Sequence, residues 1–501
     1  MELIMEEREL SYLERLFHCQ IPLEETAELI VPDKCADAEE ILDAFGTLLL
    51  RETVWEQGIL LCKGTVRGVV LFRTVEGRVE RLETELPFDL RREWNAEGME
   101  GVLQYRCELC SVDGKILNSR KLLLRVGIIC KAELYGRQNR ILRDIEEPSE
   151  NLQLLRGVYP VKLPVDLAEK SFTFTDEPEL PELSAPIARL LKVLCQPRVL
   201  EQKAAGGKGV FKTELLLHIL YADEEDQLHS HDWRLPLSQY VDFPRDIEGG
   251  ELQTILHVTE LDLEPDSSIR SRRLFLRMGL RACTTVYDIR EMAVIRDAFC
   301  TDGLLEPKWQ RWQCRSLLDR QLLSGEARWK DTEDLNSVVD MTVFAAEPEL
   351  CHSSDLLELR IPLCCNVLYR DKEGQLRGKL LRSISELTLP LHTDGEAVTG
   401  RVHTGTPAIL SNGGNLELRL PLQLQVDSYG LRELQSLDGG QISPFPITTE
   451  KRPSLLLCRT EGEESLWDIA KHHNTSVEAI SKANDLTDPI LPQGTMLLIP
   501  L

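Results

Sequence analysis

Apolar and polar residues alternate along much of this chain, which is the pattern of β-strands with one buried face and one wet face. Lys121 and Arg125 lie on one face of such a run. The opposite face of the same run carries Leu122, Leu124, Val126, Ile128 and Cys130. Apolar residues occupy every second position again from 418 to 426. This pattern is typical of antiparallel sheets in a sandwich or an open barrel, so we predict a mainly β fold.

Three segments repeat one arrangement of strands and turns. Residues 63–90, 208–244 and 360–391 each contain a strand-like run, an acidic turn and a second, alternating strand. Each also contains an apolar-Pro-apolar step, namely Leu86-Pro87-Phe88, Leu235-Pro236-Leu237 or Leu389-Pro390-Leu391. Two strands around a charged turn predict a hairpin. Two further strand-like runs follow each hairpin, which gives a repeat of about 140 residues, far longer than the roughly 20–50 of a solenoid repeat.

We therefore predict three tandem β-sandwich or barrel-like domains, at residues 1–140, 141–295 and 296–437. Residues 438–453 contain Gly, Pro and Ser in a proportion that favours a flexible linker. This linker would join the β domains to a separate C-terminal module at 454–501.

The C-terminal module has helical as well as strand patterns. Ser465 precedes Asp468 by three positions, and Thr475 precedes Glu478 by the same spacing. A hydroxyl followed at this distance by a carboxylate is typical of the capping box at the start of a helix. Apolar residues at helical spacing follow in both cases. With a strand-like run at either end, the module is predicted to be a small βααβ domain.

The order of these elements and the residues in them resemble a LysM domain. The matching residues are Ser465, Leu466, Ile469, Ala470, Val477, Ile480, Asn484, Leu486, Gly494, Ile499 and Pro500. The resemblance implies a shallow groove for N-acetylglucosamine chains, between the loops at 461–466 and 484–493. The candidate groove residues are Glu464, Ser465, Asn484 and Leu491.

One position in this candidate groove departs from the family pattern. LysM domains usually carry Gly-Asp before the Ser-Leu pair, and this chain has Glu463-Glu464. A side chain then stands where the backbone of a glycine would approach a sugar closely. Peptidoglycan binding is therefore kept as an alternative to a protein-docking role.

Three repeats followed by a LysM-like module resemble the SPOCS-domain spore-coat proteins of endospore-forming bacteria. The likeness covers nearly the whole chain and is most specific at residues 215–244. The resemblance implies a non-enzymatic scaffold that is made in the mother-cell cytoplasm and recruited to the forespore surface. Its implied partners are the ATP-hydrolysing stage IV sporulation protein A and other coat proteins, with the LysM domain as the docking module.

A docking module needs an apolar or aromatic anchor that loses its water on binding. For contacts with the ATPase we predict Trp467, Leu486 and Ile490. The last two lie in or beside a loop with Asp-Pro and Pro-Gln-Gly turns, and loops commonly carry binding groups. The alternative for Trp467 is packing in the small core of the module.

Two other functions remain open at this point. One is a peptidoglycan-binding protein of the spore cortex or cell wall. The other is a wall hydrolase anchored by its LysM domain, which rests on that domain alone because no catalytic group is evident beside it.

Charge and composition narrow the range of partners. The chain has 58 Lys and Arg against 83 Asp and Glu, a formal net charge of −25. A field of this sign repels phosphate backbones and anionic lipid, which argues against nucleic acid or a membrane surface as the main partner. Glu6, Glu7 and Glu9 interrupt the N-terminal segment where a secretory signal would need an apolar core. No apolar run of about 18 residues occurs, so we expect a cytoplasmic protein without membrane insertion.

No cluster of reactive residues has the spacing of a catalytic or metal site. Cys107 and Cys110 form a C-x-x-C in a predicted strand, where positions three apart face opposite sides. No second pair stands at zinc-site spacing. His229 and His231 point the same way and could supply two metal ligands, but we favour the interpretation that they belong to a polar turn beside a hairpin. The 14 cysteines are most simply reduced core residues, and we expect no enzyme, no cofactor and no tightly bound metal.

Overall fold

The computed structural model describes residues 2–94, 100–266, 271–329, 335–353, 356–390, 395–412, 415–446, 454–460, 465–486, 494 and 496–500. In these ranges the chain forms twenty-two strands and two helices, and both helices lie in the C-terminal module. The predicted mainly β fold is confirmed. Within the same ranges, no helix is long and apolar enough to span a membrane.

The first unit, residues 6–144, is a sandwich of two antiparallel three-stranded sheets. One sheet has the order β1-β6-β5, formed by β1 (Glu6–Ile30), β6 (Lys121–Asp144) and β5 (Val102–Asn118). The other has the order β2-β3-β4, formed by β2 (Ala38–Glu56), β3 (Ile59–Thr74) and β4 (Val79–Glu93). The apolar face predicted for residues 121–130 is buried in the core between them.

The second unit, residues 152–300, repeats this topology. Its sheets have the orders β7-β12-β11 and β8-β9-β10. The strands are β7 (Leu152–Asp176), β8 (Arg189–Ala205), β9 (Lys208–Ala222), β10 (Leu228–Asp242), β11 (Glu251–Pro265) and β12 (Leu274–Cys300).

The third unit, residues 303–444, repeats it again with one extra short strand in each sheet. β13 (Gly303–Trp329), β20 (Asn415–Pro444) and β18 (Gly395–Thr404) form one sheet, and β19 (Ala408–Asn412) also pairs with β20. The other sheet contains β14 (Ser337–Ala345), β15 (Glu349–Ser353), β16 (Leu356–Arg370) and β17 (Leu376–Pro390).

The three predicted hairpins are β3–β4, β9–β10 and β16–β17, and each is paired as antiparallel strands. Their acidic turns have a local cause. The carboxylates of Asp223 and Asp371 each accept two backbone N–H groups of their own turn. Gly77 and Gly374 supply the left-handed backbone that closes the first and third turns, at φ 84° and 81°. Asp226 does so in the second turn, at φ 57°.

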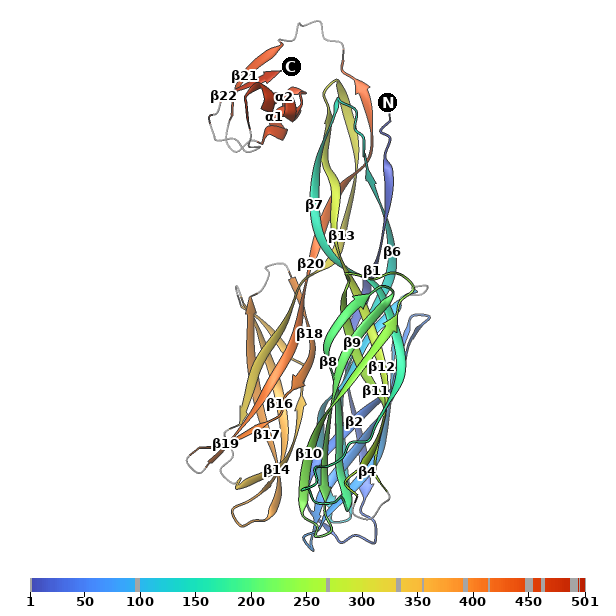
Figure 1. Cartoon of the computed structure of the whole chain (residues 1–501), viewed down its shortest axis with the longest axis vertical. Coiled ribbons are helices and arrows are strands. Elements are labelled where there is room, and N and C mark those ends of the chain that lie inside the picture. Colours follow the sequence, from blue (N-terminus) through green and yellow to red (C-terminus); the bar gives the residue numbers. More distant parts are fainter. Residues whose placement is uncertain are drawn as a thin grey trace.

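The first and last strands of each unit extend past its sandwich and meet in a shared stalk (Figure 1). The stalk is formed by residues 6–15 with 135–144, 152–164 with 287–300, and 303–317 with 429–444. One of its apolar clusters draws on all three units and contains Leu10, Tyr12, Val161, Leu163, Met292, Trp312, Cys314 and Leu434. The three units are therefore joined by a common core as well as by the chain.

The strands of the stalk run through the positions at which the sequence predicted domain boundaries. The predicted domain ends at 140, 295 and 437 fall inside β6, β12 and β20. The predicted linker also begins too early, because residues up to Pro444 continue β20 and pair with β13, Gly440 standing opposite Pro307. Alternating residues do not distinguish the part of a strand that lies in a sandwich from the part that packs in the stalk.

Candidate functional site

The C-terminal module is a two-stranded antiparallel sheet with two short helices. Its elements are β21 (Leu455–Arg459), α1 (Leu466–His473), α2 (Val477–Ala483) and β22 (Met496–Pro500). Its buried core consists of Leu466, Ile469, Ala470, Ile480, Leu497 and Ile499. The predicted βααβ order is confirmed.

The first predicted helix cap is present, and the second is displaced by one residue. The hydroxyl of Ser465 accepts the backbone N–H of Asp468 at 3.2 Å. At the second helix the cap is Ser476, whose hydroxyl accepts the N–H of Ala479 at 3.0 Å. Thr475 precedes this cap, and its own N–H donates to the carbonyl of Ala470 at the end of α1.

Trp467 lies between the module and the stalk. Its indole Nε1 donates to Oδ2 of Asp297 at 2.8 Å, and its ring meets Phe299 edge-on at 4.9 Å between centroids. The ammonium group of Lys471, one turn further along α1, lies 2.7 Å from both carboxylate oxygens of Asp297. Helix α1 therefore holds the module against the end of β12, beside the tip of the stalk (Figure 1).

The other described candidate residues have roles within the module. The amide of Asn484 bonds both the N–H and the carbonyl of Leu498, at 2.7 Å each, and thereby ties α2 to β22. Leu486 is half-buried against the module core. Ser465 serves as the helix cap described above. Three further candidates, Glu464, Ile490 and Leu491, lie outside the described residues.

The LysM domain family matches residues 461–500 of the chain. A LysM domain indicates a peptidoglycan- or carbohydrate-binding module. No curated protein matches the chain, and no solved structure does. The family match therefore covers the C-terminal module and leaves the three β units without an assigned relative.

A buried charge cluster stands where the three units meet. Lys192 of β8 is fully buried, and its ammonium group lies 2.7 Å from Asp43 of β2 and 2.8 Å from Asp340 of β14. Each of these residues follows a bulge in the corresponding strand of its unit, opposite Leu220, Leu71 and Leu368. The cluster is therefore assembled from equivalent positions of the three units.

Electrostatics favour the charged forms of Lys192 and Asp340. Burial alone would lower the pKa of Lys192, but the carboxylates of Asp340 and Asp43 outweigh it and raise that pKa. Burial likewise favours a higher pKa for Asp340, yet Lys192 and His218 lower it to about 2. The His218 ring lies 2.7 Å from Asp232 and 2.9 Å from Asp340.

Beside this cluster lies a cavity of about 490 Å³ that all three units line. Its wall includes Glu108 of the first unit, Trp233 of the second and Val339 of the third. Arg106 and Arg401 stand beside Glu108 and lower its pKa against the opposing effect of burial. The pair of Arg401 with Glu108 joins the third unit to the first.

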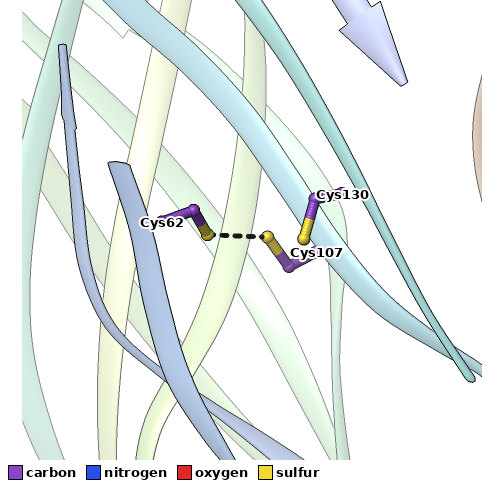
Figure 2. Close-up of side chains that lie close together, drawn as sticks. All are labelled: Cys62, Cys107 and Cys130. Carbon is purple, nitrogen blue, oxygen red and sulfur yellow. Dashed lines mark hydrogen bonds between the residues drawn. The ribbon is translucent and has the colours of Figure 1, made fainter. Parts of the chain in front are cut away.

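Sequence reasoning missed a group of three thiols in the first unit. Cys62, Cys107 and Cys130 come from β3, β5 and β6 and gather in the sandwich core (Figure 2). The C-x-x-C partner Cys110 is not part of this group. The thiols meet because β5 pairs with β6 and the facing sheet packs β3 against them, so no spacing in the sequence reveals the group.

Proposed function

We propose that this protein is a non-enzymatic scaffold of the spore coat, recruited from the mother-cell cytoplasm to the forespore surface. In this proposal the protein reaches the forespore surface by binding the stage IV sporulation protein A ATPase. It then promotes assembly of further coat proteins. The observation that supports this most is the arrangement of three β units of one topology followed by a LysM domain. That arrangement is the one in which the sequence resembles SPOCS-domain coat proteins.

The shape and charge of the molecule suit such a role. Three sandwiches and a stalk form an elongated body with the LysM domain near one end (Figure 1). The net charge of −25 favours protein partners over nucleic acid or anionic lipid. A rigid body with several separate faces can hold more than one partner at fixed spacing.

Within the LysM domain, the segment after α2, predicted from sequence to be a loop, is the proposed place for the ATPase contact. Trp467 is already engaged with Asp297 and Phe299, so it acts in holding the module to the stalk. Ile490 remains the proposed apolar anchor, with Leu486 beside the loop. Trp467 is therefore left out of the proposed partner contact, although the sequence predicts all three side chains in it.

The test is co-purification of the full chain with the ATPase. Ile490→Asp should abolish co-purification, because a charge replaces the apolar anchor, and should leave thermal unfolding nearly unchanged. Leu457→Asp is the matched control, since Leu457 is an exposed apolar residue on β21 of the same module. Binding that survives Ile490→Asp would place the docking surface elsewhere, most simply on the β units.

Peptidoglycan binding is the second candidate function. The LysM family match favours it directly. Against it stands the replacement of the family's usual Gly-Asp by Glu463-Glu464 in the groove that the resemblance predicts. The side-chain amide of Asn484 also hydrogen-bonds Leu498 within the module, so fewer of its hydrogen-bonding positions are available to a sugar.

A further inference from the structure

The thiols of Cys62, Cys107 and Cys130 form a compact group between the two sheets of the first unit. All three sulfurs lie within 4.8 Å of one another, and those of Cys62 and Cys107 are 3.4 Å apart. Cys107 and Cys130 stand opposite each other on adjacent strands, while Cys62 comes from the facing sheet (Figure 2). The three Cys side chains thus converge on one point from two sides.

The second unit shows what the fold itself needs at these positions. The same interval separates Arg125 from Tyr135 in β6 and Arg277 from Tyr287 in β12. Cys130 and Ala282 lie midway along these intervals, so Ala282 is the counterpart of Cys130. Ala282 is paired with Leu256, as Cys130 is with Cys107.

The third counterpart follows from the Pro-containing strand. Cys62 pairs with Leu90, three residues after Pro87, and Phe211 pairs with Gln239, three residues after Pro236. Phe211, Leu256 and Ala282 form part of one buried apolar cluster. The second unit therefore builds the same fold with ordinary apolar residues at these positions. The fold itself does not require cysteines there, so it does not explain why three thiols converge in the first unit.

The sulfur geometry matches what a thiophilic ion requires. Three sulfurs in a plane, each about 2.3 Å from a central ion, would be about 4.0 Å apart. Soft thiolate ligands select Cu(I) or Zn(II). Zn(II) in structural sites is almost always four-coordinate, and in the described part of the chain no other Cys, His, Asp or Glu belongs to this group.

We propose that Cys62, Cys107 and Cys130 form a three-coordinate thiolate site for a single Cu(I) ion. The inference is independent of the scaffold function. The sandwich core keeps water from the ion, and the thiols lose protons as they bind it, so affinity rises with pH. The sequence predicts no tightly bound metal because Cys62, Cys107 and Cys130 are not at the spacing of a metal-binding motif.

An aromatic cluster lies in part on the strand beside the one that carries Cys62. Thr53, opposite Cys62, is followed two residues later by Trp55. The Phe17 ring contacts those of Trp55 and Trp94, at 4.8 and 4.9 Å between centroids. Trp94 is 41% exposed, so this aromatic cluster reaches the surface of the first unit.

The test is an anaerobic titration of the reduced full chain with Cu(I) in the presence of a chromogenic Cu(I) chelator as competitor. The expected result is one ion per chain that resists the competitor, with ultraviolet sulfur-to-copper charge-transfer absorption. Cys130→Ala, which installs the residue of the second unit, should abolish retention of that ion against the competitor. Cys195→Ala is the matched control, because it removes an equally buried thiol outside the group.

Thermal unfolding of both metal-free variants establishes whether they fold. If Cys130→Ala does not fold, Cys107→Val removes a different ligand and serves in its place. Equal retention by Cys130→Ala and Cys195→Ala would overturn the site. So would retention of Zn(II) in place of Cu(I), since it implies a fourth ligand. Loss of two hydrogens from the chain on mild oxidation, without any Cu(I) retention, would identify a disulfide pair instead.

Discussion

Lys192 shows how single residues set the arrangement of the units. It is fully buried, and its two carboxylate partners come from two other units. The Coulombic gain of such a cluster roughly offsets its desolvation, so its net contribution to stability is small, whereas loss of one partner leaves an uncompensated buried charge. The cluster therefore acts chiefly to specify which surfaces of the units meet.

Lys192→Met should consequently lower the free energy of unfolding by about 3–5 kcal/mol, because Asp43 and Asp340 remain buried without a counter-charge. Denaturant titration measures this loss. Lys212→Met is the control, since Lys212 pairs with Glu201 on the surface, and it should leave the midpoint unchanged. A Lys192→Met midpoint equal to that of the control would contradict the role assigned to the cluster.

His218 gives the junction a defined pH dependence. Burial lowers its pKa, but Asp232 and Asp340 outweigh burial and raise the value from 6.5 to about 9. Because the folded state favours the protonated ring, its contribution to stability is complete below about pH 6.5 and is lost as the pH rises through about 9. The low pKa of Asp340 acts in the opposite direction, with a contribution lost as the pH falls toward 2.

Comparison of melting temperatures between the native chain and His218→Gln tests this prediction. The native chain should be the more stable near pH 5–6, and the difference should vanish near pH 10. His472→Gln on the LysM surface should not reproduce this trend. A difference that stays constant from pH 5 to pH 10 would show that His218 does not act through its charge.

At the scale of elements, the sequence predicts local strands, turns and caps, but not which distant strands and helices pack together. The buried face of residues 121–130, the three hairpins and the Ser465 cap follow from neighbouring residues alone, and all are confirmed. The stalk, the contact of Trp467 with Asp297 and the three-thiol group each join strands or helices far apart in the chain. No alternation or spacing in the sequence encodes which distant strand will be the neighbour.

The contact between α1 and β12 predicts how the LysM domain is held. Asp297→Ala removes the acceptor of Trp467 and the counter-charge of Lys471, so the module should separate from the stalk and the radius of gyration in small-angle X-ray scattering should increase. Asp288→Ala is the control on the same strand, because Asp288 pairs with Arg290 and not with the module. An unchanged radius in Asp297→Ala would mean that Phe299 packing alone holds the module.

At the scale of the whole molecule, the stalk couples the three units. Trp312 is buried in the stalk cluster to which every unit contributes. Trp312→Ala should therefore cost about 3–5 kcal/mol and shift the unfolding of all three units together in differential scanning calorimetry. Leu431→Ala, an exposed stalk position, should have little effect. A shift confined to one of several transitions would show that the units unfold independently.

The measurement that tests the proposed function most directly is a paired binding assay with the purified full chain. One arm offers the stage IV sporulation protein A ATPase on a resin, and the other offers insoluble peptidoglycan in a sedimentation assay. The scaffold function predicts retention by the ATPase, loss of that retention in Ile490→Asp, and no sedimentation above a protein without a LysM domain. Sedimentation with peptidoglycan together with no retention by the ATPase would contradict it and establish the carbohydrate-binding alternative.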